Sequence, residues 1–218
     1  TYCVVGALVA SRHPHNPIGW IFCTTGFLSA LNMLSAGYAL YSELVMPIPG
    51  GALARWFSIW IWIPNALLPI TFALLLFPDG RFLSLRWRPI AWAAGLGIAA
   101  YMFGLAFYPD SLVEVGIRTP NPYGISGSTE ALNILMIAAA PFVLVGVLGS
   151  IASIVVRYRN AIGIERAQLK VLAVAGVTVI VGCILSGIPW WIWGDNPLTQ
   201  ELSIVFTDLI LINIVIAT

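Results

Sequence analysis

The fold is decided by a short polar stretch, Phe77-Pro78-Asp79-Gly80-Arg81-Phe82-Leu83-Ser84-Leu85-Arg86-Trp87-Arg88-Pro89, which lies between two long apolar runs. The run before it, 56–76, and the run after it, 90–108, are each close to the ~20 residues that a helix needs to cross a bilayer. Pro78-Asp79-Gly80 is typical of a turn, because proline presets φ, aspartate bonds its own backbone and glycine accepts a positive φ. The stretch is therefore predicted to be a loop that joins two transmembrane helices.

The composition is that of an integral membrane protein. Of the 218 residues, 60% are apolar and 9% are charged, and the mean hydropathy is +0.94. Soluble domains contain about 25% charged residues. The lipid bilayer is thus the expected partner, and the net charge of +1 without a basic tail excludes nucleic acid binding. Three cysteines lie in apolar runs without paired spacing and are predicted to be buried small residues: Cys3, Cys23 and Cys183.

The apolar runs predict an all-α transmembrane bundle of about seven helices, the first and last truncated, which together form a single domain. The predicted helices cover about residues 1–10, 18–41, 56–77, 89–108, 131–156, 169–193 and 202–218. Helical spacing of Leu112, Val113 and Ile117 predicts that the longest loop, 109–129, can hold a short interfacial helix. A β-barrel is disfavoured, because no segment alternates in polarity over about 10 residues.

The cations predict the orientation of the helices. Short loops rich in Lys and Arg stay in the cytoplasm. With strict alternation of loops, 8 of the 10 cations fall on one side: Arg12, Arg81, Arg86, Arg88, Arg157, Arg159, Arg166 and Lys170. The other side has Arg55 and Arg118. The N-terminus is therefore predicted outside and the C-terminus in the cytoplasm. The segment Glu165 to Lys170 is interpreted either as plain topogenic charge or as a coupling element to a cytoplasmic domain.

Four polar side chains in the predicted spans are candidates for contact with a ligand or signal. An ionisable group at membrane depth costs several kcal/mol unless it is paired or faces water. Asp208 is the one acid well inside a span, followed by Asn213 on the same helix. The alternative is that this span begins later, which leaves Asp208 near the outer interface. Asn32 and Asn65 are mid-membrane amides, which more often bond across helices than bind ligands.

The sequence predicts no catalytic residue, metal site or cofactor. His13 and His15 have the spacing of a metal-binding pair, but without a third ligand a solvated loop is favoured. The chain contains no HExxH, P-loop, GxSxG or dinucleotide motif.

An ordered set of motifs coincides with the predicted loops. They are Asn16-Pro17-Ile18-Gly19-Trp20, Leu76-Phe77-Pro78-Asp79-Gly80-Arg81 with Arg86-Trp87-Arg88-Pro89, Asn121-Pro122-Tyr123-Gly124-Ile125, and Arg157-Tyr158-Arg159 with Glu165-Arg166-Ala167-Gln168-Leu169-Lys170. The set resembles the multi-span N-terminal sensor region of bacterial sensor histidine kinases, including those related to competence and quorum-sensing kinases. The chain departs from the pattern at Val171, where tryptophan is expected, and at Tyr123, where leucine is commoner.

The resemblance implies a membrane input module in the bacterial cell membrane. Its last helix would lead into a cytoplasmic dimerisation and histidine-phosphotransfer domain, followed by an ATP-binding domain. The implied partners are a second copy of the chain, its own kinase domain and a response regulator. The resemblance names no ligand residue.

Two other classes of function compete with a sensor. A small multi-pass transporter or channel would show inverted repeats, or broken helices facing polar residues at the midplane. The sequence has no convincing internal repeat, and its spans contain few polar residues. A membrane-embedded enzyme would need several His, Asp or Glu residues converging at one depth, and Asp208 alone is too few.

Overall fold

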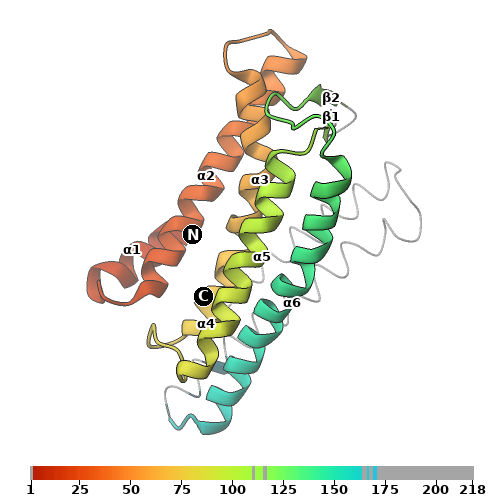
Figure 1. The fold of residues 1–218 in the computed structure, drawn as a ribbon. Coiled ribbons are helices and arrows are strands. Elements are labelled where there is room, and N and C mark those ends of the chain that lie inside the picture. Colours follow the sequence, from red (N-terminus) through yellow and green to blue (C-terminus); the bar gives the residue numbers. More distant parts are fainter. Residues whose placement is uncertain (1, 110, 115–116, 164–165, 167–168, 171–218) are drawn as a thin grey trace, which may run out of the picture. The chain divides into compact units, whose positions relative to one another are not determined.

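A computed structural model of the chain describes residues 2–109, 111–114, 117–163, 166 and 169–170. The chain divides into two compact units, Thr1–Ser153 and Ile154–Thr218. The described residues form five main helices, four of them long, and one small hairpin (Figure 1). The helices are α1 (Tyr2–Arg12), α2 (Pro17–Leu44), α3 (Gly51–Leu68) extended by the π-helical η1 (Pro69–Ala73) and by α4 (Leu74–Leu76), α5 (Arg88–Ala106) preceded by the 3-10 turn η2 (Leu85–Trp87), and α6 (Thr129–Asn160).

Four of these helices are long and apolar enough to cross a membrane: Pro17–Leu44, Gly51–Leu76, Leu85–Ala106 and Thr129–Asn160. Their outer surfaces are strongly apolar, as shown by Met33 at 81% and Ile137 at 73% exposure. Side chains of this kind are covered at no cost by lipid tails. The prediction of an all-α, multi-pass membrane fold is confirmed at this level. α1 has 11 residues and, at about 1.5 Å per residue, is too short to span.

The expected count of seven helices requires correction, because the described residues hold five. The further helices predicted over 169–193 and 202–218 fall outside the described residues, apart from 169–170. The predicted start of the third helix was also wrong, since α3 begins at Gly51 rather than near Trp56. Arg55 was interpreted as a loop residue because of its charge. It is instead tolerated within the helix, where it pairs with an acid on α2.

The loop 109–129 contains a β-hairpin in place of the expected interfacial helix. Strand β1 (Ser111–Glu114) pairs with β2 (Ile117–Pro120) in antiparallel register, with Ser111 opposite Pro120 and Glu114 opposite Ile117. The segment is rich in β-branched residues, which favour a pleated backbone over a helix. Spacing alone could not distinguish these structures over so few residues.

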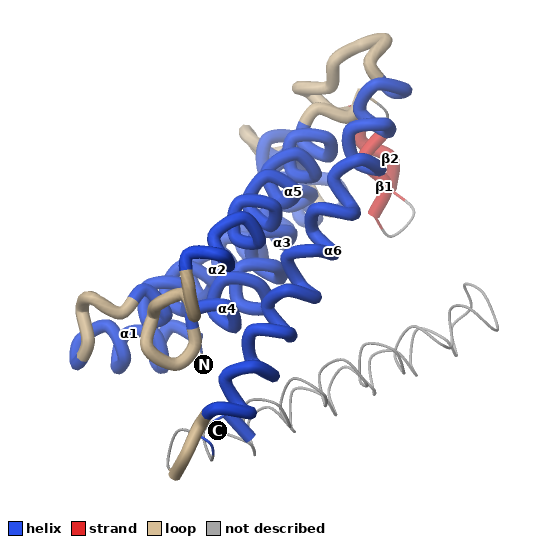
Figure 2. The backbone as a smooth tube through the Cα atoms, turned by 60° about the horizontal axis from the view of Figure 1, so that its bottom comes forward, coloured by secondary structure: helices blue, strands red, loops and turns tan. Residues whose placement is uncertain are grey.

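Glycines let neighbouring helices of the first unit approach closely. A Cβ atom on Gly19 of α2 would lie 2.6 Å from the backbone nitrogen of Ala10 in α1. A Cβ on Gly97 of α5 would lie 2.8 Å from the backbone nitrogen of Val143 in α6. α5 runs alongside α6 in both views of the backbone (Figures 1 and 2). These seams are typical of membrane helices, whose association depends on close packing because lipid removes the hydrophobic driving force.

Candidate functional site

The structure places two of the four candidate ligand or signal residues. On α3, the Asn65 Oδ1 accepts a hydrogen bond from the Ser29 hydroxyl of α2 at 2.8 Å. Ser29 Oγ also lies 2.9 Å from the carbonyl of Thr25, one turn back on its own helix. Asn32 is half-buried on α2. Asp208 and Asn213 lie outside the described residues, so the structure does not bring the four together.

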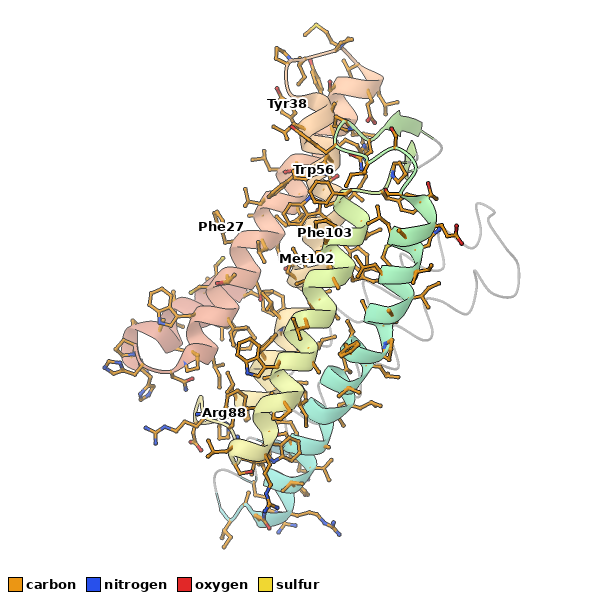
Figure 3. All side chains as sticks on the ribbon, in the orientation of Figure 1. Phe27, Tyr38, Trp56, Arg88, Met102 and Phe103 are labelled. Carbon is orange, nitrogen blue, oxygen red and sulfur yellow. The ribbon has the colours of Figure 1, made fainter. Side chains whose placement is uncertain are left out.

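The predicted coupling and topology residues fall in both units. In the first, Arg81, Arg86 and Arg88 are exposed, and Arg88 begins α5 (Figure 3). In the second, Arg157 is buried, Arg159 and Lys170 are exposed, and the Arg166 guanidinium lies 5.1 Å from the centre of the Tyr158 ring. That distance is within reach of a cation–π contact. Glu165 lies outside the described residues.

Two of the motif stretches meet in space at the end of the first unit where α2 begins. Asn16 is the N-cap of α2, and its Oδ1 accepts a hydrogen bond from the Ile18 backbone N–H at 3.0 Å. Its Nδ2 donates to the carbonyl of Pro78 at 3.2 Å. Gly80, with φ of +71°, lies so close that a Cβ there would be 2.5 Å from Asn16 Oδ1 and 2.6 Å from Pro17 Cδ. The loop after α1 is thereby fixed against the loop after α4.

Replacing Asn16 with alanine is expected to lower the free energy of unfolding by about 1–2 kcal/mol, because it removes both the helix cap and the bond to Pro78. Thermal unfolding in mild detergent measures the loss. Asn16→Asp is the informative companion, since it keeps the cap acceptor but cannot donate to Pro78. Its loss should fall between the alanine variant and the wild type, and equal losses for both variants would contradict the role of the loop contact.

A buried ion pair joins α2 and α3 at the opposite end of these helices. The Arg55 guanidinium donates two hydrogen bonds to the Glu43 carboxylate, from Nε to Oε1 at 3.0 Å and from Nη2 to Oε2. The Arg55 side chain is 3% exposed and that of Glu43 is 15% exposed. A parallel two-bond geometry of this kind fixes orientation as well as charge. The pair therefore holds the two helix ends in one register.

Sequence reasoning missed this pair because it assigned both residues to one polar loop. The signal that could have found it is their spacing around the turn residues Pro47, Pro49, Gly50 and Gly51. Gly50 has φ of +85°, and the turn reverses the chain so that positions 43 and 55 face each other on antiparallel helices.

An aromatic cluster lies next to this pair on α3. The Trp56 ring packs edge-on to Trp60 with ring centres 5.5 Å apart, and Phe57 does the same at 4.9 Å from Trp60. Trp56 also contacts Tyr123 of the long loop, at 4.8 Å. The Trp56 indole N–H donates to the carbonyl of Ala106 at 2.6 Å, which ties α3 to the end of α5 (Figure 3).

The motif stretch 121–125 is fastened to the same place. The buried Asn121 amide donates to the carbonyls of Ala106 at 3.0 Å and Tyr108 at 2.7 Å, and its Oδ1 accepts from the Tyr123 N–H. The Ile125 N–H donates to Phe107 at 3.0 Å. These bonds satisfy carbonyls that the end of α5 leaves without a helical partner. The long loop is therefore bonded directly to the end of α5, and Tyr123 contacts Trp56 of α3.

Between these two ends, the third span has an irregular turn. The segment Pro69–Ala73 is π-helical and begins with a proline, which has no N–H for the helical ladder. The buried Ser150 hydroxyl of α6 lies 2.8 Å from the carbonyls of both Thr71 and Gly146. Single π-helical turns inside α-helices are rare and are frequent at functional sites. This segment is held by one cross-helix hydroxyl.

The chemistry of these contacts is structural in kind. Within the described ranges, no group of three His, Cys, Asp or Glu residues could hold a metal ion. No family model matches the chain, and neither a curated protein nor a solved structure matches it. By their length and composition, the four long apolar helices indicate a multi-pass membrane protein.

Proposed function

We propose that the chain is the membrane-embedded sensory input module of a two-component sensor histidine kinase. It would pass an external or intramembrane signal through its last helix to a cytoplasmic kinase. The proposal rests on the contacts that the motif stretches make in the folded chain. Stretches 16–20 and 76–81, on which the resemblance depends, contact each other through Asn16 and Pro78. Stretch 121–125 binds the end of α5 through Asn121.

The third span supplies a path for the signal. It begins beside the Glu43–Arg55 pair and the Trp56–Tyr123 contact, and it ends at the loop bonded to Asn16. A stimulus that moved the long loop would act on Trp56 and thereby on this helix. Signalling of this kind needs two packings that differ by a few kcal/mol, with the stimulus favouring one. The π-helical segment is where we place the rearrangement.

The proposal is tested on the gene and on its product. The coding sequence beyond Thr218 should encode a helix with a phosphorylatable histidine and then an ATP-binding domain. Membranes containing the whole gene product, incubated with radiolabelled ATP, should incorporate acid-labile, base-stable phosphate at that histidine. A response regulator should then accept it. A stop codon soon after the last predicted span would refute the kinase, and a small transporter or channel would become the better proposal.

Asp208 distinguishes the two classes further. In a sensor, Asp208→Asn should shift the basal phosphorylation level, because the residue lies on the helix proposed to lead to the kinase. In a proton-coupled transporter, the same change should abolish transport, because a carboxyl at membrane depth would carry the proton. Unchanged output would remove Asp208 from the candidate site.

A further inference from the structure

Exposed cations gather where α1 ends. Arg12 is the last residue of α1 and is exposed, as is His13 after it. The loop that follows is bonded to Pro78 through Asn16, which places the next basic stretch beside it. The two loops 12–16 and 77–88 together contain four arginines and one acid, Asp79. This end of the first unit therefore has a marked excess of positive charge.

A hollow of about 310 Å³ opens on the surface at the same place, lined by Leu8, Val9, Arg12 and His13. Leu8 and Val9 form an apolar wall, and Arg12 lies about one helical turn beyond Leu8, about 6 Å along the axis. A ligand that matches this lining must have an apolar part against Leu8 and Val9 and a negatively charged group beside Arg12, about one helical turn away.

The depth of the hollow in the membrane selects the occupant. α1 is apolar through Ala10 and then gives way to a polar loop with two prolines, so we expect the hollow to lie where hydrocarbon meets headgroups. We propose that it is a binding site for an anionic phospholipid, with the phosphate on Arg12 and an acyl chain against Leu8 and Val9. This site is independent of the proposed kinase function.

Charge decides which lipid is preferred. The end of α1 carries the partial negative charge of the helix dipole, about half an elementary charge, which opposes an anion. Arg12 alone outweighs this, and Arg81, Arg86 and Arg88 add a field that favours a net negative headgroup. Each basic residue near a membrane surface strengthens binding to anionic lipid about fivefold. A zwitterionic headgroup gains little from that field, because its own cation is repelled.

The test is lipid retention by the whole chain, measured by native mass spectrometry after incubation with equal amounts of phosphatidylglycerol and phosphatidylcholine that have identical acyl chains. The wild type should retain phosphatidylglycerol in at least tenfold excess. Arg12→Gln should lower that retention about tenfold, because it removes a directed contact as well as a charge. Arg88→Gln is the matched control, since it removes the same charge from the same end but outside the hollow, and its loss should not exceed about fivefold.

Equal losses in the two arginine variants, or equal retention of both lipids by the wild type, would overturn the site. A further variant guards against an Arg12→Gln chain that does not fold. Leu8→Trp fills the hollow and leaves every cation in place. It should also lower phosphatidylglycerol retention, and unchanged retention would overturn the assignment of the apolar wall.

Discussion

Replacing Glu43 with glutamine is expected to lower the free energy of unfolding by about 3 kcal/mol. The change keeps the shape of the side chain but removes the negative charge that accepts two hydrogen bonds from the guanidinium of Arg55, which is 3% exposed. Breaking a buried pair from one side costs about 3–5 kcal/mol, and the 15% exposure of Glu43 places this case at the lower end. Thermal or denaturant unfolding in mild detergent measures the loss.

The double variant Glu43→Gln with Arg55→Met should recover most of that stability, because a buried pair replaced on both sides by uncharged groups is often neutral. Glu130→Gln is the control, since it removes an exposed acid from the first turn of α6 and should cost about 0.5 kcal/mol through the helix dipole. A Glu43→Gln variant as stable as the control would show that the pair does not hold α2 and α3 together.

Replacing Gly19 with valine is expected to cost about 3 kcal/mol and to separate α1 from α2. The new Cβ would lie 2.6 Å from the backbone nitrogen and 3.1 Å from the Cβ of Ala10. Neither neighbour can rotate away, so one helix must shift, and overpacking of this kind costs about 1–3 kcal/mol or more. Thermal unfolding measures the cost. Protease sensitivity of the loop after α1 reports the separation.

Gly37→Val is the matched control on the same helix, because nothing lies within 4 Å of the position that its Cβ would take. Valine is a better helix former than glycine by a few tenths of a kcal/mol, so this variant should be neutral or slightly stabilising. Similar instability in both valine variants would contradict close packing of α1 on α2 as the cause.

The membrane fold could be predicted because apolar runs of span length have few alternative structures. Proline also marked the start of α2 to within one residue, at Pro17. The failures have local physical causes. Arg55 appeared to be a loop residue because its charge was weighed without its partner on another helix. The β-hairpin was missed because its strands have four residues each and carry no decisive period.

The candidate site was less accessible from the sequence than the fold. The motif stretches could be recognised one by one in the sequence, but the contacts between them could not. Asn16 and Pro78 are 62 positions apart in the sequence and meet only because the helices between them pack against each other. The hydrogen bond from Trp56 to Ala106 depends on the relative placement of α3 and α5, which no local pattern encodes.

We propose that the chain crosses the membrane with its arginine loop in the cytoplasm and its long loop outside, so that a signal received on one side could be reported on the other. Cysteine labelling tests this most directly, in a background where Cys3, Cys23 and Cys183 are alanine. Ser84 and Ser126 are exposed in the two loops, and each is replaced by cysteine in turn. In intact cells, a membrane-impermeant maleimide should label the Ser126→Cys variant and should reach the Ser84→Cys variant only after permeabilisation. Labelling of the Ser84→Cys variant in intact cells would contradict the account.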